Sequence, residues 1–557
     1  MSSYDLQSVK LPLLTGRALR LFASAVAGGP TKALLVPKLL QDAGIPKLHE
    51  TRLDEVPTLL PLIPAAEKAQ KYAPPTIPLN ALAPARPLPL RTVHDFAAAY
   101  RNGDTTPLAV AERVLDAIAA SDRGNHPLRA IIALEREDVL AQAKAATERI
   151  KEGRPLSVLD GVPVAIKDEV DMVPYPTRVG TKVLGQKPAA QDATAVARLR
   201  AAGAILIGKA NMHEIGINPT GHNLHYGPAR NPHNLDYDTG GSSSGPAAAT
   251  AAGLCPVSLG ADGGGSIRVP AAHCGLVGLK ATFGRISEKG AAPLCWSVAH
   301  VGPIGTSAAD VALAYSLMAG PDVHDQNTLV QPVVTLDNWQ QTDLTGIRMG
   351  IFPDWFNHAA PEIVAANQQV VDAFVKMGAQ IVEIDIPHLD LIRIAHALTI
   401  LSEMASSMKN LGVDPKAFAP ATRINLLIGG EFGAADYVKA QRVRTKALQI
   451  FDEIYQQVDV IVTPTTALTA PEIVPASLSD GISDLSTVTE IMRFIFPSNL
   501  TGHPAISFPV GYDGKGLPIG MQVIGRHWEE AMLLRFAFAA EQVVERKRPS
   551  LYFDLLS

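Results

Sequence analysis

The sequence predicts an α/β protein in which layers of helices surround a central sheet. Short apolar runs of strand length alternate with longer segments of helical periodicity, which is typical of this class. The composition, 47% hydrophobic and 18% charged, is that of a globular protein and excludes a largely disordered chain. At 557 residues the chain is long enough for one large domain or a few.

Residues 1–90 are predicted to form a helical appendage to a larger domain, residues 91–557. The appendage ends in a proline-rich stretch, residues 73–90, which favours an extended connector. Before this stretch, leucines and basic residues predict one or two short amphipathic helices. Two roles stay open for these helices: packing on the rest of the chain, or lying on a membrane surface or over a pocket.

Within the larger domain, apolar runs and helical patterns follow one another along the chain. The strand candidates are residues 129–134, 163–166, 204–208, 277–281, 347–352, 381–386, 458–463, 505–510 and 521–524. The helix candidates are residues 107–120, 193–202, 361–377 and 529–544, and Asp192 is the expected N-cap of the second.

Bulk properties exclude several classes of function. A net charge of −5 over this length gives no basic footprint for nucleic acid. The three cysteines fit neither a disulfide framework nor a tetrahedral metal site, and they favour a reducing, cytoplasmic compartment. Asp5 precedes any apolar run, so no secretory signal is expected. The uncharged residues 239–261 hold too many serines and glycines for a lipid-facing helix and are predicted to be buried protein interior.

The first motif that points to chemistry is the glycine- and serine-rich run at residues 240–245 (GGSSSG), which contains Ser242. Such a run is by itself typical of a linker. Residues 246–252 follow directly, however, and consist of small helix-compatible residues with a proline in the first turn. The run is therefore predicted to lead into a buried helix.

A second motif, residues 262–268 (DGGGSIR), contains Ser266, twenty-four positions after Ser242. Three residues without side chains precede this serine, so their backbone N–H groups can approach a ligand oxygen and stabilise developing negative charge. These residues are Gly263, Gly264 and Gly265. A sharp turn is the alternative explanation for them. Asp262 and Arg268 flank the loop and are predicted to lock it by an ion pair or hydrogen bonds.

Lys167, in residues 161–168 (GVPVAIKD), is the candidate base. Serine is a poor nucleophile at its free pKa and needs a base, and no histidine adjoins either serine motif. A lysine at the end of a strand usually reaches water. If Lys167 is buried instead, its pKa falls from the usual value of about 10.4, and a neutral amine becomes available to accept a proton.

These regions also allow two other interpretations. Residues 241–245 match the G-x-S-x-G nucleophile elbow of α/β-hydrolases, which would make Ser243 the nucleophile. An elbow follows a buried strand, whereas residues 230–238 are polar and loop-like, so the context opposes it. His222 and His225 lack the helical context that would place two imidazoles on one metal. No metal site and no cofactor is predicted.

In order and spacing, these motifs resemble the amidase signature family. The resemblance implies an α/β/α fold with a mixed central sheet and a Ser–cis-Ser–Lys triad. By that resemblance Ser266 is the nucleophile, Ser242 the bridging serine that follows a cis peptide bond from Gly241, and Lys167 the base. The oxyanion role falls to Gly263, Gly264, Gly265 and the Ser266 amide, and Ser243 and Asp262 match positions that support the site.

Further motifs are similar to the plant-type fatty acid amide hydrolases of that family. They are residues 208–214 (GKANMHE), 239–245 (TGGSSSG), 462–466 (VTPTT) and 516–520 (GLPIG). The likeness covers nearly the whole chain and is most specific at residues 160–310. One departure is Ala261, where many relatives have threonine, so that a hydrogen bond supporting the site is expected to be lost.

The resemblance implies a serine hydrolase that cleaves fatty acid amides such as N-acylethanolamines through an acyl-enzyme. It leads us to expect a small-molecule lipid amide as the substrate, a homodimer, and a cytoplasmic protein with peripheral membrane contact. Residues 491–496 and 398–408 are apolar enough to line an acyl channel or to be ordinary core. The alternatives are a broad-specificity amidase or carbamate hydrolase acting on aryl or short-chain amides, and a non-catalytic scaffold or transamidation component.

Overall fold

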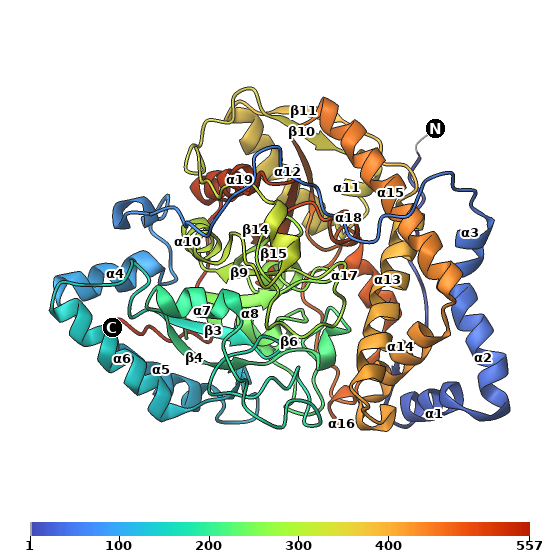
Figure 1. Cartoon of the computed structure of the whole chain (residues 1–557), viewed down its shortest axis with the longest axis horizontal. Helices are drawn as coiled ribbons and strands as arrows, with labels where there is room; N and C mark the ends of the chain where they lie inside the picture. Colours follow the sequence, from blue (N-terminus) through green and yellow to red (C-terminus); the bar gives the residue numbers. More distant parts are fainter. Residues whose placement is uncertain (1–2) are drawn as a thin grey trace.

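The computed structural model describes residues 3–557 and has a mixed sheet of eleven strands at its centre, flanked by helices (Figure 1). The strand order is β11-β10-β12-β15-β14-β8-β9-β7-β3-β4-β2. The strands are β2 (Ile131–Ala133), β3 (Pro163–Lys167), β4 (Ile205–Ala210), β7 (Val257–Ala261), β8 (Val277–Lys280), β9 (Val301–Gly305), β10 (Arg348–Ile351), β11 (Gln380–Glu383), β12 (Val460–Pro464), β14 (Ala505–Tyr512) and β15 (Pro518–Gly525). The predicted α/β architecture with a mixed sheet is confirmed.

Parallel and antiparallel pairing occupy different parts of this sheet. Strand β3 runs parallel to its neighbours β4 and β7, and β10 runs parallel to β11 and β12. The strands between these two groups pair antiparallel. Because β3 and β7 are parallel neighbours, their carboxyl ends meet at one edge of the sheet. Lys167 ends β3, and Ala261, which precedes the second serine motif, ends β7.

Each predicted strand corresponds to a strand of this sheet, but β7 and β9 were not predicted. Strand β9 contains two glycines and Pro303, residues that usually mark turns or edge strands. It nevertheless lies between β7 and β8, and Pro303 faces Leu259 of β7. Strand β7 is short, and Ser258 and Gly260 alternate with its apolar residues, so the local pattern of hydrophobicity is weak.

The predicted helices are present as α5 (Pro107–Ser121), α7 (Thr194–Ala201), α12 (Pro361–Lys376) and α19 (Glu530–Val543). The predicted cap of α7 was wrong. Ala193 is the N-cap, and the Asp192 carboxylate instead forms an ion pair with Arg200 and accepts a hydrogen bond from the Val173 amide. A carboxylate next to a helix start can thus be engaged by a cation one or two turns along the helix.

Other helices complete the layers around the sheet. They are α4 (Val93–Asn102), α6 (Arg136–Lys151), α8 (Ser244–Ala251), α9 (Arg268–His273), α10 (Ala308–Met318), α13 (Leu389–Asn410), α14 (Pro420–Glu431), α15 (Ala434–Gln457), α17 (Leu485–Met492) and α18 (Phe496–Thr501). Helix α8 follows the first serine motif, packs on β3 and β7, and is entirely buried. The prediction that residues 239–261 form protein interior is confirmed.

The chain before residue 51 forms β1 (Leu14–Thr15) and three helices, α1 (Gly16–Ala27), α2 (Gly29–Asp42) and α3 (Ile45–Glu50). Figure 1 shows these helices, in blue, beside α13, α14 and α15. Leu19 and Ala23 of α1 pack on Ile424 of α14. Strand β1 pairs with β13 (Ile482–Ser483). The segment before residue 51 therefore packs on elements from the second half of the chain.

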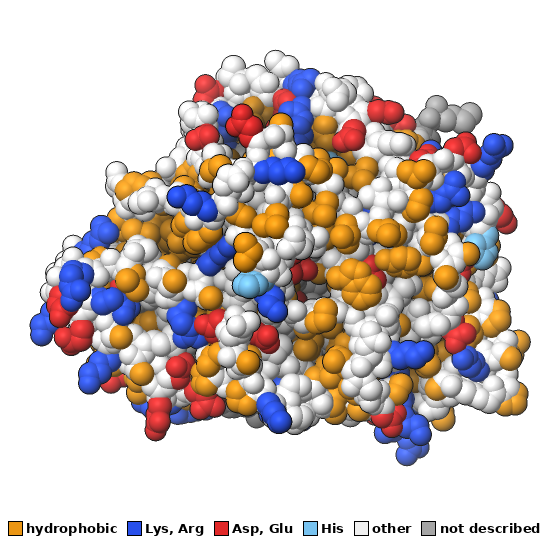
Figure 2. Space-filling view, in the orientation of Figure 1, with side chains coloured by type: hydrophobic (Ala, Val, Ile, Leu, Met, Phe, Trp, Pro, Cys, Tyr) orange, Lys and Arg blue, Asp and Glu red, His pale blue; other side chains and the backbone are white. Residues whose placement is uncertain are grey.

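Some apolar side chains of this segment face outward. Leu21 of α1 and Leu34 of α2 are 71% and 76% exposed. No helix within residues 3–557 combines the length and apolar character that crossing a membrane requires. Figure 2 shows one face of the molecule, on which acidic and basic side chains are interspersed around the periphery and hydrophobic ones gather toward the middle.

Candidate active site

Lys167 is buried at the end of β3, where its amine contacts both serine motifs. The Nζ atom lies 2.8 Å from the Oγ of Ser242 and 3.0 Å from the backbone oxygen of Ala261. It also lies 3.3 Å from a carboxylate oxygen of Glu169. The side chain is 1% exposed. This buried position excludes the possibility that the Lys167 amine simply extends into solvent.

Burial is the main influence on the charge of this amine. It lowers the pKa of Lys167 below that of a solvated lysine, because desolvation disfavours the ammonium form. The Glu169 carboxylate acts in the opposite direction, since it stabilises the ammonium. The site therefore makes Lys167 less basic than a solvated lysine while keeping one acidic neighbour close to it.

Ser242 stands in the turn before α8, held by backbone contacts on both sides. The peptide bond between Gly241 and Ser242 is cis, as the family resemblance implies. The Gly241 amide donates to the Pro219 carbonyl, and the Ser242 carbonyl accepts from the His213 amide. A Cβ at position 241 would lie 2.1 Å from the Thr220 oxygen, so only glycine fits there.

Ser243 points away from this turn and into the sheet. Its hydroxyl donates to the Ala261 carbonyl at 3.2 Å and accepts from the Ala261 amide at 3.3 Å. A hydroxyl that is buried against a strand in this way has no access to substrate, so the nucleophile-elbow interpretation was wrong. The same contacts explain why alanine suffices at position 261, because its backbone accepts hydrogen bonds from both Lys167 and Ser243.

The glycine loop before Ser266 is fixed by Asp262 and Arg268. The Asp262 carboxylate accepts the amides of Gly265, at 2.6 Å, and of Ile267. Arg268 is completely buried and forms a two-pronged ion pair with this carboxylate. Burial alone would raise the pKa of Asp262, but the ion pair and its hydrogen bonds hold that pKa well below the usual range.

This arrangement revises the expected oxyanion donors. Because the Gly265 amide already donates to Asp262, it is engaged before a substrate arrives. Gly263 and Gly264 bring their backbone to the walls of the cavities at Ser266. The amides that stay available to a developing oxyanion are those of Gly263, Gly264 and Ser266, none of which donates a hydrogen bond within residues 3–557.

Two cavities meet at Ser266. The larger, of about 450 Å³, extends from Ser266 and Gly264 to α13 and α17 and is lined largely by apolar side chains. Met492 and Phe496 from one predicted channel segment, and Ile400 and Leu401 from the other, line it. The remaining apolar residues of the first segment, Ile491, Phe494 and Ile495, belong to the core. Both predicted segments therefore contribute to a channel wall and to the core.

Part of the wall of this cavity comes from the N-terminal segment. Leu6, Gln7 and Val9 line it, together with Asp42 and Gly44 from the end of α2 and the turn after it. This segment is held by the Asp5 carboxylate, which accepts from the Asp390 amide and the Lys47 ammonium, and by Leu11, which hydrogen-bonds Ser486. We define residues 3–15 as the N-terminal strap. The strap thus forms part of the cavity wall, whereas the helices whose role was left open, α1 and α2, pack on α14.

The smaller cavity, here called the rear chamber, has a volume of about 30 Å³. Ser266, Ser242 and Lys167 all line it, so it joins the three residues of the predicted triad. Its remaining walls include Glu169, Glu288, Cys295, Leu294 and Met404.

Sequence reasoning missed several residues beside the serines. Glu169 follows Lys167 by two positions, in the turn after β3, and this closeness in sequence was a usable signal. Glu288 and Cys295 come from a loop without a recognisable motif. His396 of α13, whose Nε2 atom lies 2.9 Å from the Gly263 oxygen, is more than 120 positions away from the loop it supports.

The histidines of residues 213–233 make separate local contacts. His213 contacts the Thr220 oxygen at 3.2 Å, and His225 contacts the Glu214 carboxylate at 2.5 Å. His222 contacts Ser477 at 3.1 Å. Within residues 3–557, no group of three or more His, Cys, Asp or Glu side chains is arranged to hold a metal ion.

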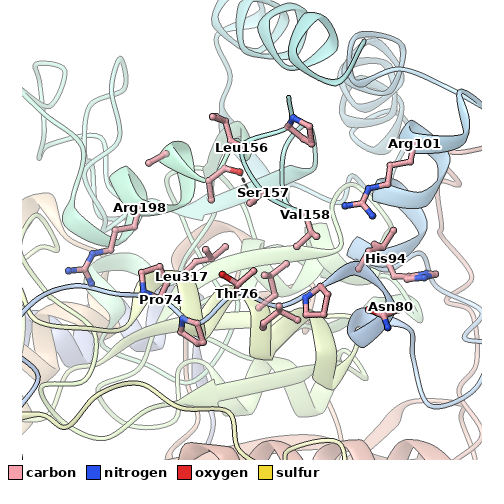
Figure 3. A pocket seen from close by; sticks show the side chains of 18 of the residues that line it. Pro74, Thr76, Asn80, His94, Arg101, Leu156, Ser157, Val158, Arg198 and Leu317 are labelled. Carbon is pink, nitrogen blue, oxygen red and sulfur yellow. Dashed lines mark hydrogen bonds between the residues drawn. The ribbon is translucent and has the colours of Figure 1, made fainter. Parts of the chain in front are cut away.

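A larger cavity, of about 900 Å³, lies elsewhere (Figure 3). It is bounded by the proline-rich connector, by α4 and α7, and by residues 155–158. Arg101 and Arg198 lie at opposite sides of it in Figure 3. Its lining contains none of the predicted catalytic or oxyanion residues, so its size alone does not mark it as the active site.

Comparisons with known proteins agree with this geometry. The model of the family described as Amidase matches residues 110–534. The chain is 38% identical to a fatty acid amide hydrolase of Medicago truncatula, over 99% of this chain and 96% of that protein. It is 37% identical to a fatty acid amide hydrolase of Arabidopsis thaliana, over 100% of this chain and 96% of that protein.

A solved structure supports the same conclusion. The fold is similar to that of a bacterial aryl acylamidase of the amidase signature enzymes, with a TM-score of 0.73 and 25% identity, over 82% of this chain and 97% of that one. The family match, the near full-length relatives and the shared fold agree with the serine and lysine motifs. The chain belongs to the amidase signature family and is an amide-cleaving hydrolase.

Proposed function

We propose that this enzyme hydrolyses fatty acid amides, N-acylethanolamines among them, to fatty acid and amine through a Ser–Ser–Lys triad. The observation that carries the proposal is the contact of the buried Lys167 amine with Ser242, in a chamber that Ser266 also lines. Lys167 would be the base, Ser242 the proton relay and Ser266 the nucleophile, so the proposed mechanism needs no histidine.

In the proposed acylation step, neutral Lys167 accepts a proton from Ser242 while Ser242 accepts one from Ser266. The Ser266 oxygen then attacks the amide carbon and forms a tetrahedral intermediate. Its oxyanion would be stabilised by the amides of Gly263, Gly264 and Ser266, which are fixed before the reaction begins. The relay then runs in reverse and protonates the departing nitrogen, so that the C–N bond breaks and an acyl-enzyme remains.

Deacylation uses the same groups. A water molecule that enters where the amine has left gives its proton to the relay and attacks the ester carbon. The proton then returns through Ser242 to Ser266, and the fatty acid is released. Lys167 ends each half of the reaction in its initial state, so one lysine serves twice as base and twice as acid.

The cavity of about 450 Å³ supports an acyl chain as the larger part of the substrate. Cavities of this size bury most of a small ligand, and the apolar lining from α13, α17 and the N-terminal strap would replace water around methylene groups. The likeness to a named fatty acid amide hydrolase over almost all of both chains supports the same substrate class.

A broad-specificity amidase or carbamate hydrolase for aryl or short-chain amides is the second candidate. Polar side chains in the lining of this cavity, among them Asn218, Arg393 and Asn425, favour it, since a purely lipid channel needs none of them. The likeness to a bacterial aryl acylamidase points in the same direction.

Amides that differ only in acyl length separate the two candidates. We expect kcat/KM to rise steeply from short to long saturated N-acylethanolamines, and Ser266→Ala to abolish both turnover and labelling by a fluorophosphonate. Equal or better rates on short or aryl amides would favour the second candidate. Undiminished turnover by Ser266→Ala would refute the triad itself.

Peripheral membrane contact and a homodimer are also proposed. The exposed Leu21 and Leu34, with basic residues on the same two helices, support contact of α1 and α2 with a lipid surface. Sedimentation with anionic vesicles before and after Leu21→Glu/Leu34→Glu tests the contact. Light scattering of the purified protein tests the dimer.

A further inference from the structure

The rear chamber is so small that its lining residues indicate which chemical group can occupy it. A water molecule needs roughly 10–15 Å³ of cavity volume in this measure. The chamber, at about 30 Å³, therefore holds about two waters or a group of similar size. Whatever fills so small a space is within contact distance of most of its polar walls.

The chemistry indicates which part of the substrate faces this chamber, if the proposed function holds. The departing nitrogen takes its proton from Ser242, so it must lie on the side of Ser266 where Ser242 stands. Ser242 and Lys167 line the rear chamber, and neither lines the larger apolar cavity. The acyl chain thus faces the apolar cavity, and the nitrogen faces the chamber.

Glu288 is a polar residue of the chamber to which no contact has been assigned so far. It is partly buried, lines the chamber, and its carboxyl group makes no hydrogen bond or ion pair with any side chain or backbone group of residues 3–557. Glu169, in contrast, contacts Lys167. A carboxyl group that lines a small chamber and has no partner in the protein is left to hydrogen-bond with water or with the substrate.

The protonation state of the Glu288 carboxyl group determines which hydrogen bonds it can make. Burial raises the pKa of Glu288 well above its usual range, and the neighbouring carboxyls of Asp325, Glu169 and Glu403 raise it further. A neutral carboxylic acid keeps a carbonyl oxygen that accepts hydrogen bonds. Its amide counterpart, glutamine, has the same shape and an equivalent acceptor.

We infer that Glu288 is a specificity-determining residue whose carbonyl oxygen accepts a hydrogen bond from the N–H of the scissile amide. The bond would orient the nitrogen so that its lone pair faces Ser242, which supplies the proton. An ester of the same acid carries oxygen where the amide carries N–H and has nothing to donate. Glu288 therefore favours amides over esters at the leaving-group side.

The test uses two substrates with one acyl chain, an N-methyl amide and a methyl ester, because both leaving groups are small enough for the chamber. For Glu288→Leu we expect kcat/KM on the amide to fall about tenfold, the size of one lost hydrogen bond, and that on the ester to change less than about twofold. Glu288→Gln should keep the amide-to-ester ratio of the parent enzyme, since it keeps the acceptor.

Lys289→Met is the matched control. Lys289 follows Glu288 in the chain, is exposed, and does not line the chamber. We expect this variant to leave the amide-to-ester ratio unchanged. A ratio altered as much by Lys289→Met as by Glu288→Leu would overturn the inference.

Two further results would contradict it. They are an unchanged amide-to-ester ratio in Glu288→Leu, whether or not both rates fall, and a Glu288→Gln variant that behaves like Glu288→Leu. These results are distinct from failure of the proposed function, which would appear as turnover that does not depend on Ser266 in the parent enzyme. Fluorophosphonate labelling of each variant verifies that Ser266 stays reactive.

Discussion

The amine of Lys167 lies 2.8 Å from the hydroxyl oxygen of Ser242, although 75 residues separate them along the chain. Strand β3 presents the lysine and the turn before α8 presents the serine. Both groups are buried, so no bulk water competes for the proton between them. The local dielectric that makes this lysine less basic also strengthens the contact that it makes with the serine.

Activity is predicted to depend on the charge of Lys167. In the proposed mechanism the neutral amine is the base, so kcat/KM should rise with pH through the pKa of Lys167 and then reach a plateau. Burial lowers that pKa, so the rise should lie below the pH at which a solvated lysine titrates. Glu169 stabilises the ammonium, and Glu169→Gln should therefore move the rise to lower pH. A profile of kcat/KM against pH measures this shift.

The exposed Glu137, on α6, provides the control for that profile. Glu137→Gln should leave the rise where it is in the parent enzyme. A shift of the rise to higher pH in Glu169→Gln would contradict the assignment of Lys167 as the base.

Gly263 is predicted to tolerate no side chain as long as Cys295 is present. A Cβ at position 263 would lie 2.6 Å from the Cys295 sulfur. Gly263→Ala should therefore displace the loop and lower kcat at least about tenfold, within the usual range for an overpacked site. The double variant Gly263→Ala/Cys295→Ala removes the clash and should recover most of that loss. Steady-state kinetics of both variants and of Cys295→Ala alone test this, and a double variant no better than the single one would exclude a steric cause.

Val9 of the N-terminal strap is predicted to limit the length of the acyl chain. Val9→Trp places a larger side chain in the wall of the apolar cavity. We expect kcat/KM for a long-chain amide to fall about tenfold while that for a short-chain amide changes little. Leu11→Trp, on the same strap but 39% exposed and outside the cavity, is the control. A uniform loss for all chain lengths would show that Val9 supports the fold and does not select substrate.

Glu541 of α19 is predicted to reduce stability above neutral pH. One carboxyl oxygen accepts the Ala308 amide at 2.6 Å, the other is buried without a partner, and burial raises the pKa to about 7. A pKa that is higher in the folded than in the unfolded state stabilises the protein at low pH. That contribution is lost as pH rises from about 4.5 through about 7.

Glu541→Gln keeps the acceptor and cannot ionise. Its free energy of unfolding should be close to that of the parent at pH 4 and higher by ~3 kcal/mol at pH 8. Urea denaturation at the two pH values measures this, with the exposed Glu545→Gln as the control. A difference that stays constant between pH 4 and pH 8 would show that Glu541 does not titrate on unfolding.

The parts of this protein that could be predicted from sequence are those with a local signal. Apolar runs located the strands, because a strand covered on both faces must be apolar throughout. The spacing of Lys167, Ser242 and Ser266, joined to the family resemblance, indicated the groups that the structure brings to one chamber. The alanine at position 261 was expected to cost a hydrogen bond, because a side-chain hydroxyl was expected there. In the structure the backbone oxygen of Ala261 accepts the hydrogen bond from Lys167 instead.

What the sequence could not predict depends on contacts between distant segments. Glu288 has no motif, and its carboxyl reaches the chamber of the serines only through the packing of segments that lie far apart in the chain. The engagement of the Gly265 amide by Asp262 is a matter of loop geometry. Pro303 argued against a strand at β9, because proline disfavours the interior of a sheet. Pairing of β9 with β7 outweighed this local preference.

The N-terminal strap also has a consequence for biosynthesis. Its residues leave the ribosome long before α17 and β13, on which they rest, so a nascent chain holds an unfinished catalytic pocket until more than 480 residues have been made. Premature release would give polypeptides that contain Lys167, Ser242 and Ser266 but lack α17 and β13. Such fragments would expose the apolar cavity lining, and they would be targets for chaperones and proteases.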